Sequence, residues 1–296
     1  MAETPLVAGV DAGGTTFKLA VAPPGERPAS HVRVDTTTPE RTVTAAATAL
    51  RALAAGAGGR IEAVGIASFG PVDIDPVSPR YGTVLATPKP GWTGTPLLGA
   101  LAEALGVPGV IQTDVNGALL AERRWGAAKD AARAAYVTVG TGIGVGIANG
   151  DGFAGAPRHP ELGHVRVARA RGDDYPGRCP FHADCLEGMA AAPALADRFG
   201  ALEALDDDAP AWPLLAIYLA QLTLTLSLAF RLDRIVLGGG VMNAPGLLDR
   251  VRRAHAASMA GYVADPPGLI ARAALGDEAG VAGACLLASD GAFKRL

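Results

Sequence analysis

A strand, a glycine-rich turn and a second strand occur twice in this chain, and this repeat limits the possible folds more than any other feature. In the first copy, the apolar run Leu6–Asp11 leads into the turn Ala12–Thr16, and further apolar residues follow. In the second copy, Tyr136–Val139 leads into Gly140–Gly144, and the run Val145–Ala148 follows. Short apolar runs bounded by glycines are typical of strands. The repeat predicts an internal duplication, with two related α/β lobes and a cleft between them.

The remaining elements predict where the two lobes divide. We expect a small lobe at residues 1–115 and a larger lobe at residues 116–279, with a last helix at about 280–296 that returns to the small lobe. Other helices are predicted at residues 41–55, 97–105, 116–125, 193–199, 212–230 and 247–259. The apolar stretch Leu214–Phe230 is interrupted by polar residues such as Gln221, which favours a buried core helix over a membrane span.

Composition narrows the class of protein. The chain has 296 residues and a net charge of -3, with basic and acidic residues interspersed, which gives no basic face for nucleic acid. Only three cysteines occur, and no signal peptide precedes Leu6. We therefore expect a soluble cytoplasmic protein without a membrane or nucleic-acid partner. His255 has no chemical partners near it in the sequence and is predicted to lie at the surface.

Three glycine-rich turns follow predicted strands and indicate a phosphate ligand. They are Asp11–Thr15, Gly140–Gly144 and Gly238–Gly240. Glycine lets the backbone approach an anion closely, and Thr15 and Thr141 add hydroxyl donors. None of the turns has the lysine-containing phosphate-loop pattern, and the turn at Gly140 joins two strands where a dinucleotide fingerprint opens a helix. The turns favour a nucleoside triphosphate.

Two acidic side chains at strand ends have two possible roles each. Asp11 is placed to act through Mg2+ bound to the phosphates, or it is a plain turn carboxylate. Asp114 follows the predicted strand Val110–Gln112, where α/β proteins usually place ligand chemistry, and is our candidate general base. Its alternative role is to cap a helix, although Asn116 competes for that role and is also placed to bind an acceptor.

The segment His159–Glu187 holds a set of residues that predicts a metal site. A compact Cys-x-x-His-x-x-Cys run supplies Cys179, His182 and Cys185, and His164 lies upstream in a turn that enters a predicted strand. Two thiolates and two imidazoles with no vacant position are typical of structural zinc. The alternatives are a disulfide or unrelated thiols. Glu161 and Glu187 bracket the ligands, and we expect the metal to hold both carboxylates toward a substrate.

In order along the chain, these motifs resemble the ROK family of sugar kinases. The matching segments are Asp11–Thr15, Gly70–Pro71, Thr113–Asn116, Val139–Gly144, Pro160–His164, the cysteine run to Glu187, and Leu237–Val241. Ser68–Pro71, Thr87–Trp92, Thr113–Asn116, His159–Glu161 and Cys179–Gly188 are similar to the bacterial fructokinase branch. His182 favours that branch, because other ROK kinases more often have four cysteines.

The resemblance implies an actin-like ATPase (ribonuclease H-like) fold that transfers the γ-phosphate of ATP to the 6-hydroxyl of fructose, with Mg2+ and structural Zn2+. It implies a homodimer, with Asp114 as the base. His164 would use one ring nitrogen for zinc and the other for a sugar hydroxyl. The implied sugar-binding residues are Gly70, Pro71, Asn116, Glu161, His164 and Glu187. The implied ATP-binding residues are Asp11, Gly13, Gly14, Thr15, Gly140, Thr141, Gly142, Gly238, Gly239 and Gly240.

The chain departs from the family pattern after the first turn. Many members have a lysine where Thr16 stands here, and Lys18, two residues later, is not included in the predicted site. The alternative acceptors are mannose, glucose or an N-acylated hexosamine. A sugar sensor without catalytic activity is a further alternative, against which Asp114 and the glycine turns argue.

Overall fold

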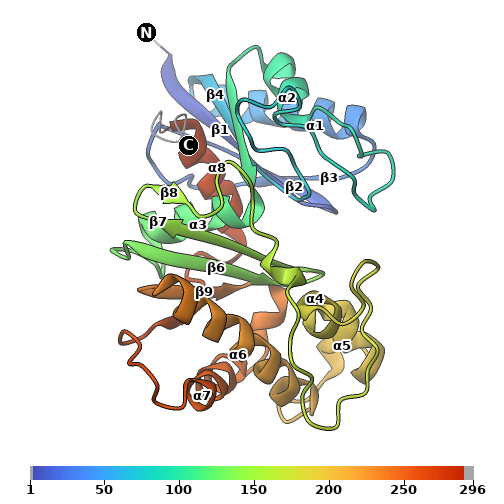
Figure 1. Cartoon of the computed structure of the whole chain (residues 1–296). Coiled ribbons are helices and arrows are strands. Elements are labelled where there is room, and N and C mark those ends of the chain that lie inside the picture. Colours follow the sequence, from blue (N-terminus) through green and yellow to red (C-terminus); the bar gives the residue numbers. More distant parts are fainter. Residues whose placement is uncertain (1–2, 290–296) are drawn as a thin grey trace. The chain divides into compact units, whose positions relative to one another are not determined.

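The computed structural model describes residues 3–289 and divides into two compact units (Figure 1). Among these residues, the first unit comprises 3–124, 151–159 and 277–289, and the second comprises 125–150 and 160–276. The first unit extends past residue 115, the boundary predicted from the sequence, because it takes in nearly all of α3 (Asp114–Trp125). The last predicted helix is α8 (Ala279–Ser289), which belongs to the first unit; residues 290–296 lie outside the described part.

In the described chain, the first unit is built on a five-stranded sheet in the order β3-β2-β1-β4-β5. The strands are β1 (Thr4–Ala12), β2 (Thr16–Ala22), β3 (Val32–Asp35), β4 (Gly59–Ser68) and β5 (Gly109–Thr113). β1 pairs antiparallel with β2 across the first glycine turn and parallel with β4, and β4 pairs parallel with β5. The carboxyl ends of β1, β4 and β5 therefore meet at one edge, where Ala12 pairs with Ser68 and Ser68 pairs with Thr113.

Alternation along β1 determines which helices cover each face of this sheet. Leu6, Ala8 and Val10 are buried in a large cluster that includes residues of α1 (Pro39–Gly56) and α2 (Leu97–Leu105). Val7 packs instead with Val281 and Cys285 of α8. Because successive strand residues point to opposite faces, α8 covers the face opposite to α1 and α2 (Figure 1). Burying each large apolar side chain here stabilises the fold by about 1.5–3 kcal/mol.

The long irregular segment between β4 and α2 is anchored by one aromatic residue. Trp92 is fully buried, and its ring lies 5.6 Å from that of Phe17 and 5.5 Å from that of Phe69, between ring centroids. Its indole Nε1 donates a hydrogen bond of 2.8 Å to the carbonyl oxygen of Thr37. The segment that carries Gly70 and Pro71 is thereby held against the core.

A second sheet of five described strands repeats the topology of the first. Its order is β10-β9-β6-β7-β8, with β6 (Arg133–Val139), β7 (Ile143–Asn149), β8 (Gly152–Phe153), β9 (Arg234–Gly238) and β10 (Ile270–Arg272). β6 pairs antiparallel with β7 across the second glycine turn and parallel with β9, and β9 pairs parallel with β10. Each sheet thus has an antiparallel hairpin followed by two parallel strands. The predicted duplication is confirmed.

The helices of the second unit are α4 (Leu186–Ala190), α5 (Ala192–Phe199), α6 (Ala211–Phe230) and α7 (Leu247–Met259). By length and composition, α6 is the one described helix that meets the requirement for crossing a membrane. Half of that stretch is buried inside the protein, and α6 packs against α4 and α7. Helix α6 is therefore central to the packing of this unit. Short 3-10 turns are η1 (Leu162–His164), η2 (Leu202–Ala204), η3 (Gly240–Asn243) and η4 (Gly276–Glu278).

His255 does not lie at the surface, so that prediction was wrong. Its side chain is buried in α7, with Nδ1 2.9 Å from Thr223 Oγ1 of α6 and Nε2 2.9 Å from Asp265 Oδ2. Ser227 Oγ donates a 2.6 Å hydrogen bond to the other oxygen of Asp265. This group links α6, α7 and the segment after α7, and buried polar groups require such partners.

Candidate functional site

Three of the predicted site segments lie at the same edge of the first sheet. The turn after Asp11, the Gly70–Pro71 segment and Asp114 follow β1, β4 and β5, whose carboxyl ends are adjacent. The Phe69 amide donates a 2.8 Å hydrogen bond to the Ala12 carbonyl, which ties the second segment to the first. Ligands of open α/β sheets usually bind at this edge.

Asp114 is the first residue of α3, and Thr113 caps the helix. The Asn116 amide donates to Thr113 Oγ1 at 3.3 Å, the N-cap to N3 contact of a helix start. Asn116 therefore does not cap α3, contrary to one of the two roles considered from the sequence. Asp114 is half-buried, and its Oδ1 accepts from the Val115 amide at 2.8 Å. Its place at the helix N-terminus stabilises a negative charge.

Asn116 and His159 form polar contacts with Gln112 and Thr113, the residues that precede Asp114. Asn116 is buried, and its Nδ2 donates to Gln112 Oε1 at 2.9 Å, while its Oδ1 has no partner among the described residues. His159 Nδ1 lies 3.4 Å from Thr113 Oγ1. Burial lowers the pKa of His159 to about 4, so its ring is neutral near pH 7. A buried acceptor such as Asn116 Oδ1 gains from a ligand hydroxyl.

Asp11 and the first glycine turn lie at the end of β1. Thr36 supports this turn, since its Oγ1 donates to the Gly13 carbonyl at 2.8 Å and its amide to the Thr15 carbonyl at 2.9 Å. A Cβ at Gly14 would meet no atom within 4 Å, so this part of the turn is open. Burial raises the pKa of the Asp11 carboxyl, and the Lys18 ammonium opposes that rise from 3.4 Å away.

Two more glycine segments share an edge of the second sheet. Thr138 of β6 pairs with Gly238 of β9, so the Gly140–Gly144 turn and Gly238–Gly240 follow adjacent parallel strands. Gly239 has a φ of 88°, a conformation that favours glycine, and a Cβ there would overlap the backbone of β6. A Cβ at Gly140 or Gly240 would meet nothing within 4 Å. Gly239 is thus required by the fold, while the other two positions leave open space.

Glu187 joins the second glycine turn to the segment with the predicted metal ligands. Its Oε2 accepts a 2.9 Å hydrogen bond from the amide of Ile143. A Cβ at Gly142 would lie 2.6 Å from the same oxygen, so a side chain there would displace the carboxylate from this position. Glu187 lies in the first turn of α4, whose N-cap is Cys185.

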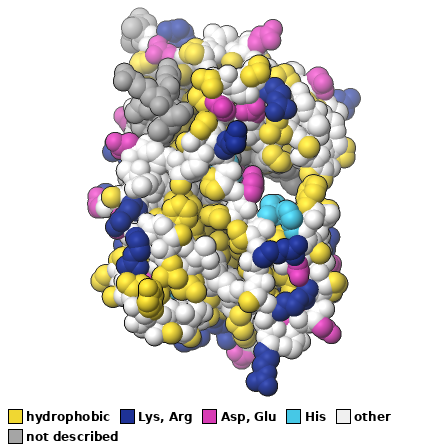
Figure 2. Space-filling view, viewed as in Figure 1, with side chains coloured by type: hydrophobic (Ala, Val, Ile, Leu, Met, Phe, Trp, Pro, Cys, Tyr) yellow, Lys and Arg dark blue, Asp and Glu magenta, His cyan; other side chains and the backbone are white. Residues whose placement is uncertain are grey.

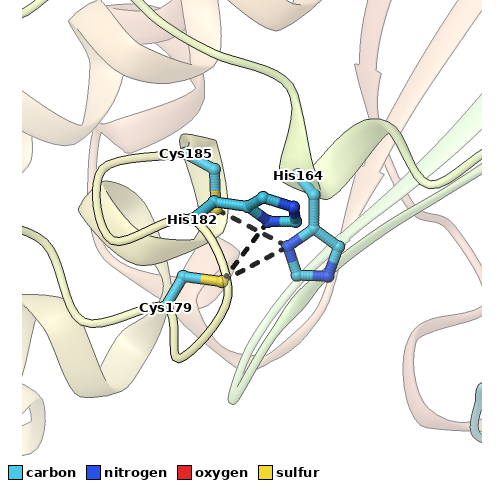
Figure 3. Close-up of side chains that lie close together, drawn as sticks. All are labelled: His164, Cys179, His182 and Cys185. Atoms are coloured by element: carbon cyan, nitrogen blue, oxygen red, sulfur yellow. Dashed lines mark hydrogen bonds between the residues drawn. The ribbon is translucent and has the colours of Figure 1, made fainter.

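The four predicted metal ligands come together in the second unit (Figure 3). One ligand atom from each of His164, Cys179, His182 and Cys185 lies within 4.8 Å of the others. Cys179 Sγ is 3.7 Å from Nδ1 of both histidines, and Cys185 Sγ is 3.5 Å from His164 Nδ1. All three cysteines of the chain are free thiols, which excludes the disulfide alternative in this structure.

These distances fit a tetrahedral zinc ion. Zn–S bonds of about 2.3 Å and Zn–N bonds of about 2.0–2.1 Å at tetrahedral angles place sulfur and nitrogen about 3.6 Å apart. Burial, followed by the nearby Cys179, raises the pKa of the Cys185 thiol, so a thiolate there requires a cation beside it. His164 lies in the short turn η1, and the strand predicted to follow it is reduced to an isolated bridge at Arg166. Nδ1 of His164 faces the sulfurs, while Nε2 lies 3.9 Å from Glu187 Oε1. The second ring nitrogen therefore points away from the metal position.

Charge is dispersed over the face of the protein that Figure 2 draws. Figure 2 shows basic and acidic side chains interspersed on the face that it draws, with no broad area of one sign. Glu161, which precedes η1, is exposed, and its carbonyl accepts from the His164 amide at 3.0 Å.

Comparison with known proteins agrees with this architecture. The sequence matches the ROK family over residues 7–291. A fructokinase of Pediococcus pentosaceus is 39% identical, and the match covers 96% of this chain and 97% of that protein. A fructokinase of Zymomonas mobilis is 40% identical, and the match covers 94% of this chain and 95% of that protein. Among solved structures, a ROK hexokinase from Thermus thermophilus has a TM-score of 0.79 at 33% identity, covering 96% of this chain and 97% of its own. A ROK glucokinase from Streptomyces griseus, in complex with glucose and AMPPNP, has a TM-score of 0.77 at 29% identity, covering 96% and 99%.

The chain belongs to the ROK family and has the actin-like ATPase fold, with two related lobes. Within that family it is an ATP-dependent sugar kinase.

Three residues that make contacts at this edge of the first sheet received no role from the sequence. Thr113 caps α3, and His159 contacts it from a segment 46 positions along the chain. Lys18 was excluded, yet it contacts Asp11. Strand alternation offers a signal for Lys18, because residues 16 and 18 of β2 point to the same face. For the other two residues, only the spatial arrangement shows the contact.

Proposed function

We propose that this sugar kinase phosphorylates fructose to fructose 6-phosphate, with Asp114 as the general base. The observation that carries the proposal is the similarity to fructokinases along nearly the whole chain, at 39–40% identity in two relatives. The start of α3 supports the role of Asp114, because a half-buried carboxylate at a strand end can accept the proton of the attacking hydroxyl.

ATP is assigned to the glycine-rich segments at the strand ends. Gly13, Gly14, Thr15, Gly140, Thr141 and Gly142 would bind the phosphates, and Gly238, Gly239 and Gly240 would lie near the nucleoside. The open space at Gly14 and Gly140 supports close approach of an anion. Asp11 would act through Mg2+, which neutralises charge on the transferred phosphoryl group. The Streptomyces griseus neighbour was solved with AMPPNP, an ATP analogue, and this supports the assignment.

The sugar-binding residues are proposed from the family resemblance. Gly70, Pro71, Asn116, Glu161, His164 and Glu187 would contact the acceptor. Asn116 Oδ1, buried without a described partner, supports its role as a hydroxyl acceptor. Zinc held by His164, Cys179, His182 and Cys185 would fix the aim of the His164 ring, leaving Nε2 for the sugar. The ion would have a structural role.

An aldohexose is the alternative acceptor. It is favoured by the Streptomyces griseus neighbour, which is a glucokinase solved with glucose. Mannose and N-acylated hexosamines belong to the same test. The family resemblance also leads us to propose a cytoplasmic location and a homodimer. Light scattering of the purified protein would test the dimer.

Release of ADP, measured by a coupled assay with fructose, glucose, mannose and N-acetylated hexosamines in parallel, tests the proposal. We expect the highest kcat/KM on fructose and identification of the product as fructose 6-phosphate. An aldohexose used as well as or better than fructose would refute the specificity. No turnover on any sugar in the presence of MgATP would refute the kinase itself.

A further inference from the structure

Lys18 is held between two carboxylates at the start of the first glycine turn. Its Nζ lies 3.4 Å from Asp11 Oδ2, and it also contacts the side chain of Asp277 and, at 3.0 Å, the Asp277 carbonyl oxygen. In the β1–β2 hairpin, Asp11 and Lys18 are directly paired residues. Cross-strand partners on one face lie close enough to interact.

The same face of β2 holds Thr16, two residues before Lys18. Phe17 and Leu19 are buried in the cluster with α1 and α2, so Thr16 and Lys18 point to the opposite face. Asp11 points to that face too, because a Cβ at Gly280 of α8 would lie 2.6 Å from its carboxylate. A lysine at position 16 and Lys18 would therefore project from the same side of the strand, close to the turn.

Two arginines also form ion pairs with Asp277 or Glu278, but their side chains are more exposed than that of Lys18. Arg27 pairs with Glu278, and Arg33 pairs with Asp277, and these arginine side chains are 44% and 56% exposed. The Lys18 side chain is 20% exposed and is the one of the three that reaches Asp11. Exposed pairs contribute little, whereas a partly buried ammonium between two carboxylates changes the local potential strongly.

The carboxylate at the start of the turn would repel an approaching triphosphate unless a cation lay beside it. Arg33 pairs with Asp277, whereas among the described ion pairs Lys18 is the cation that reaches Asp11. A lysine ammonium is a compact point charge suited to phosphate sites. We propose that Lys18 is the positioning cation of the phosphate-binding turn. This inference rests on the proposed binding of ATP at that turn.

Steady-state kinetics and binding of a non-hydrolysable ATP analogue with Mg2+ test the inference. Loss of one charge-assisted contact corresponds to about a tenfold change. In Lys18→Met we expect KM for MgATP and Kd for the analogue to rise about tenfold, while KM for the sugar changes less than about twofold. The double variant Thr16→Lys/Lys18→Met is expected to recover most of the ATP affinity.

Arg27→Gln is the matched control, because it removes an ion pair to the same segment without touching Lys18 or Asp11. It should leave both ATP constants unchanged. If Lys18→Met fails to fold, the exchanged variant Thr16→Lys/Lys18→Thr replaces it, and weak ATP binding in this folded protein would contradict the inference.

Wild-type ATP affinity in Lys18→Met, or equal losses in Arg27→Gln, would overturn the role of Lys18 and leave the proposed kinase intact. A wild-type protein that binds no MgATP would overturn both.

Discussion

At the scale of single residues, Gly142 and Gly140 form a natural comparison within one turn. A Cβ at Gly142 would lie 2.6 Å from Glu187 Oε2, whereas one at Gly140 would meet nothing within 4 Å. We expect Gly142→Ala to lower the free energy of unfolding by about 0.5–1.5 kcal/mol, because the end of the Glu187 side chain must move away from the Ile143 amide and lose that hydrogen bond. Gly140→Ala should change it by less than about 0.5 kcal/mol. Urea unfolding of both variants measures this, and equal losses would contradict the packing described here.

At the scale of elements, the segment before α4 carries the proposed metal ligands at one end and polar anchors at the other. Asp173 forms a salt bridge of 3.0 Å with Arg198, both largely buried, and accepts a hydrogen bond from Tyr218 of α6. Gln221 of α6 bonds both the amide and the carbonyl of Ala168. These contacts do not involve the metal position, so the segment should stay attached to α6 without an ion.

Removal of zinc is therefore predicted to act locally. A strong chelator should lower the unfolding free energy by at least about 1 kcal/mol, which corresponds to about 2–4 °C in Tm. It should also expose residues 176–187 to protease while α6 stays protected. Metal analysis should find about one zinc per chain before treatment. The control is Cys179→Ser/Cys185→Ser, on which the chelator should have no effect. Less than a tenth of an equivalent in protein purified without chelators would contradict the zinc assignment.

Asp265, which bonds His255 of α7 and Ser227 of α6, should make the stability of the protein depend on pH. Partial burial raises the pKa of Asp265, but hydrogen bonds from Ser227 and His255 outweigh it, so the pKa lies below its ordinary value of 3.8. A depressed carboxyl pKa stabilises the folded state above pH 3.8, and this contribution is lost as pH falls through the folded-state value. The stability difference between wild type and Asp265→Asn should therefore shrink as the pH falls below 3.8. A difference that does not depend on pH would refute this.

At the scale of the whole molecule, the duplication was predictable because strands and glycine turns leave a local pattern. The paired runs at Leu6–Asp11 and Tyr136–Val139 became β1 and β6, central strands of two sheets with the same topology. The clustering of the four predicted metal ligands was also predictable, since three of them lie within seven residues.

Other features depend on partners far apart in the sequence. His255 was expected at the surface because Thr223 lies 32 positions away, on another helix. The cap of α3 was assigned to Asn116 or Asp114, although the Thr113 hydroxyl performs it. The boundary at residue 115 fell inside what became a continuous helix, since helix-start signals do not show to which unit a helix packs. Such tertiary contacts leave no periodic pattern.

The central claim is that Asp114 activates the sugar hydroxyl for attack on ATP. Turnover of fructose by wild type and by Asp114→Asn, together with thermal unfolding and ATP-analogue binding, tests it most directly. The account predicts a fall in kcat of about 10²–10⁴-fold, because a neutral amide cannot accept the proton, with Tm and ATP binding close to wild type. Turnover within a few-fold of wild type in Asp114→Asn would contradict the assignment of the base.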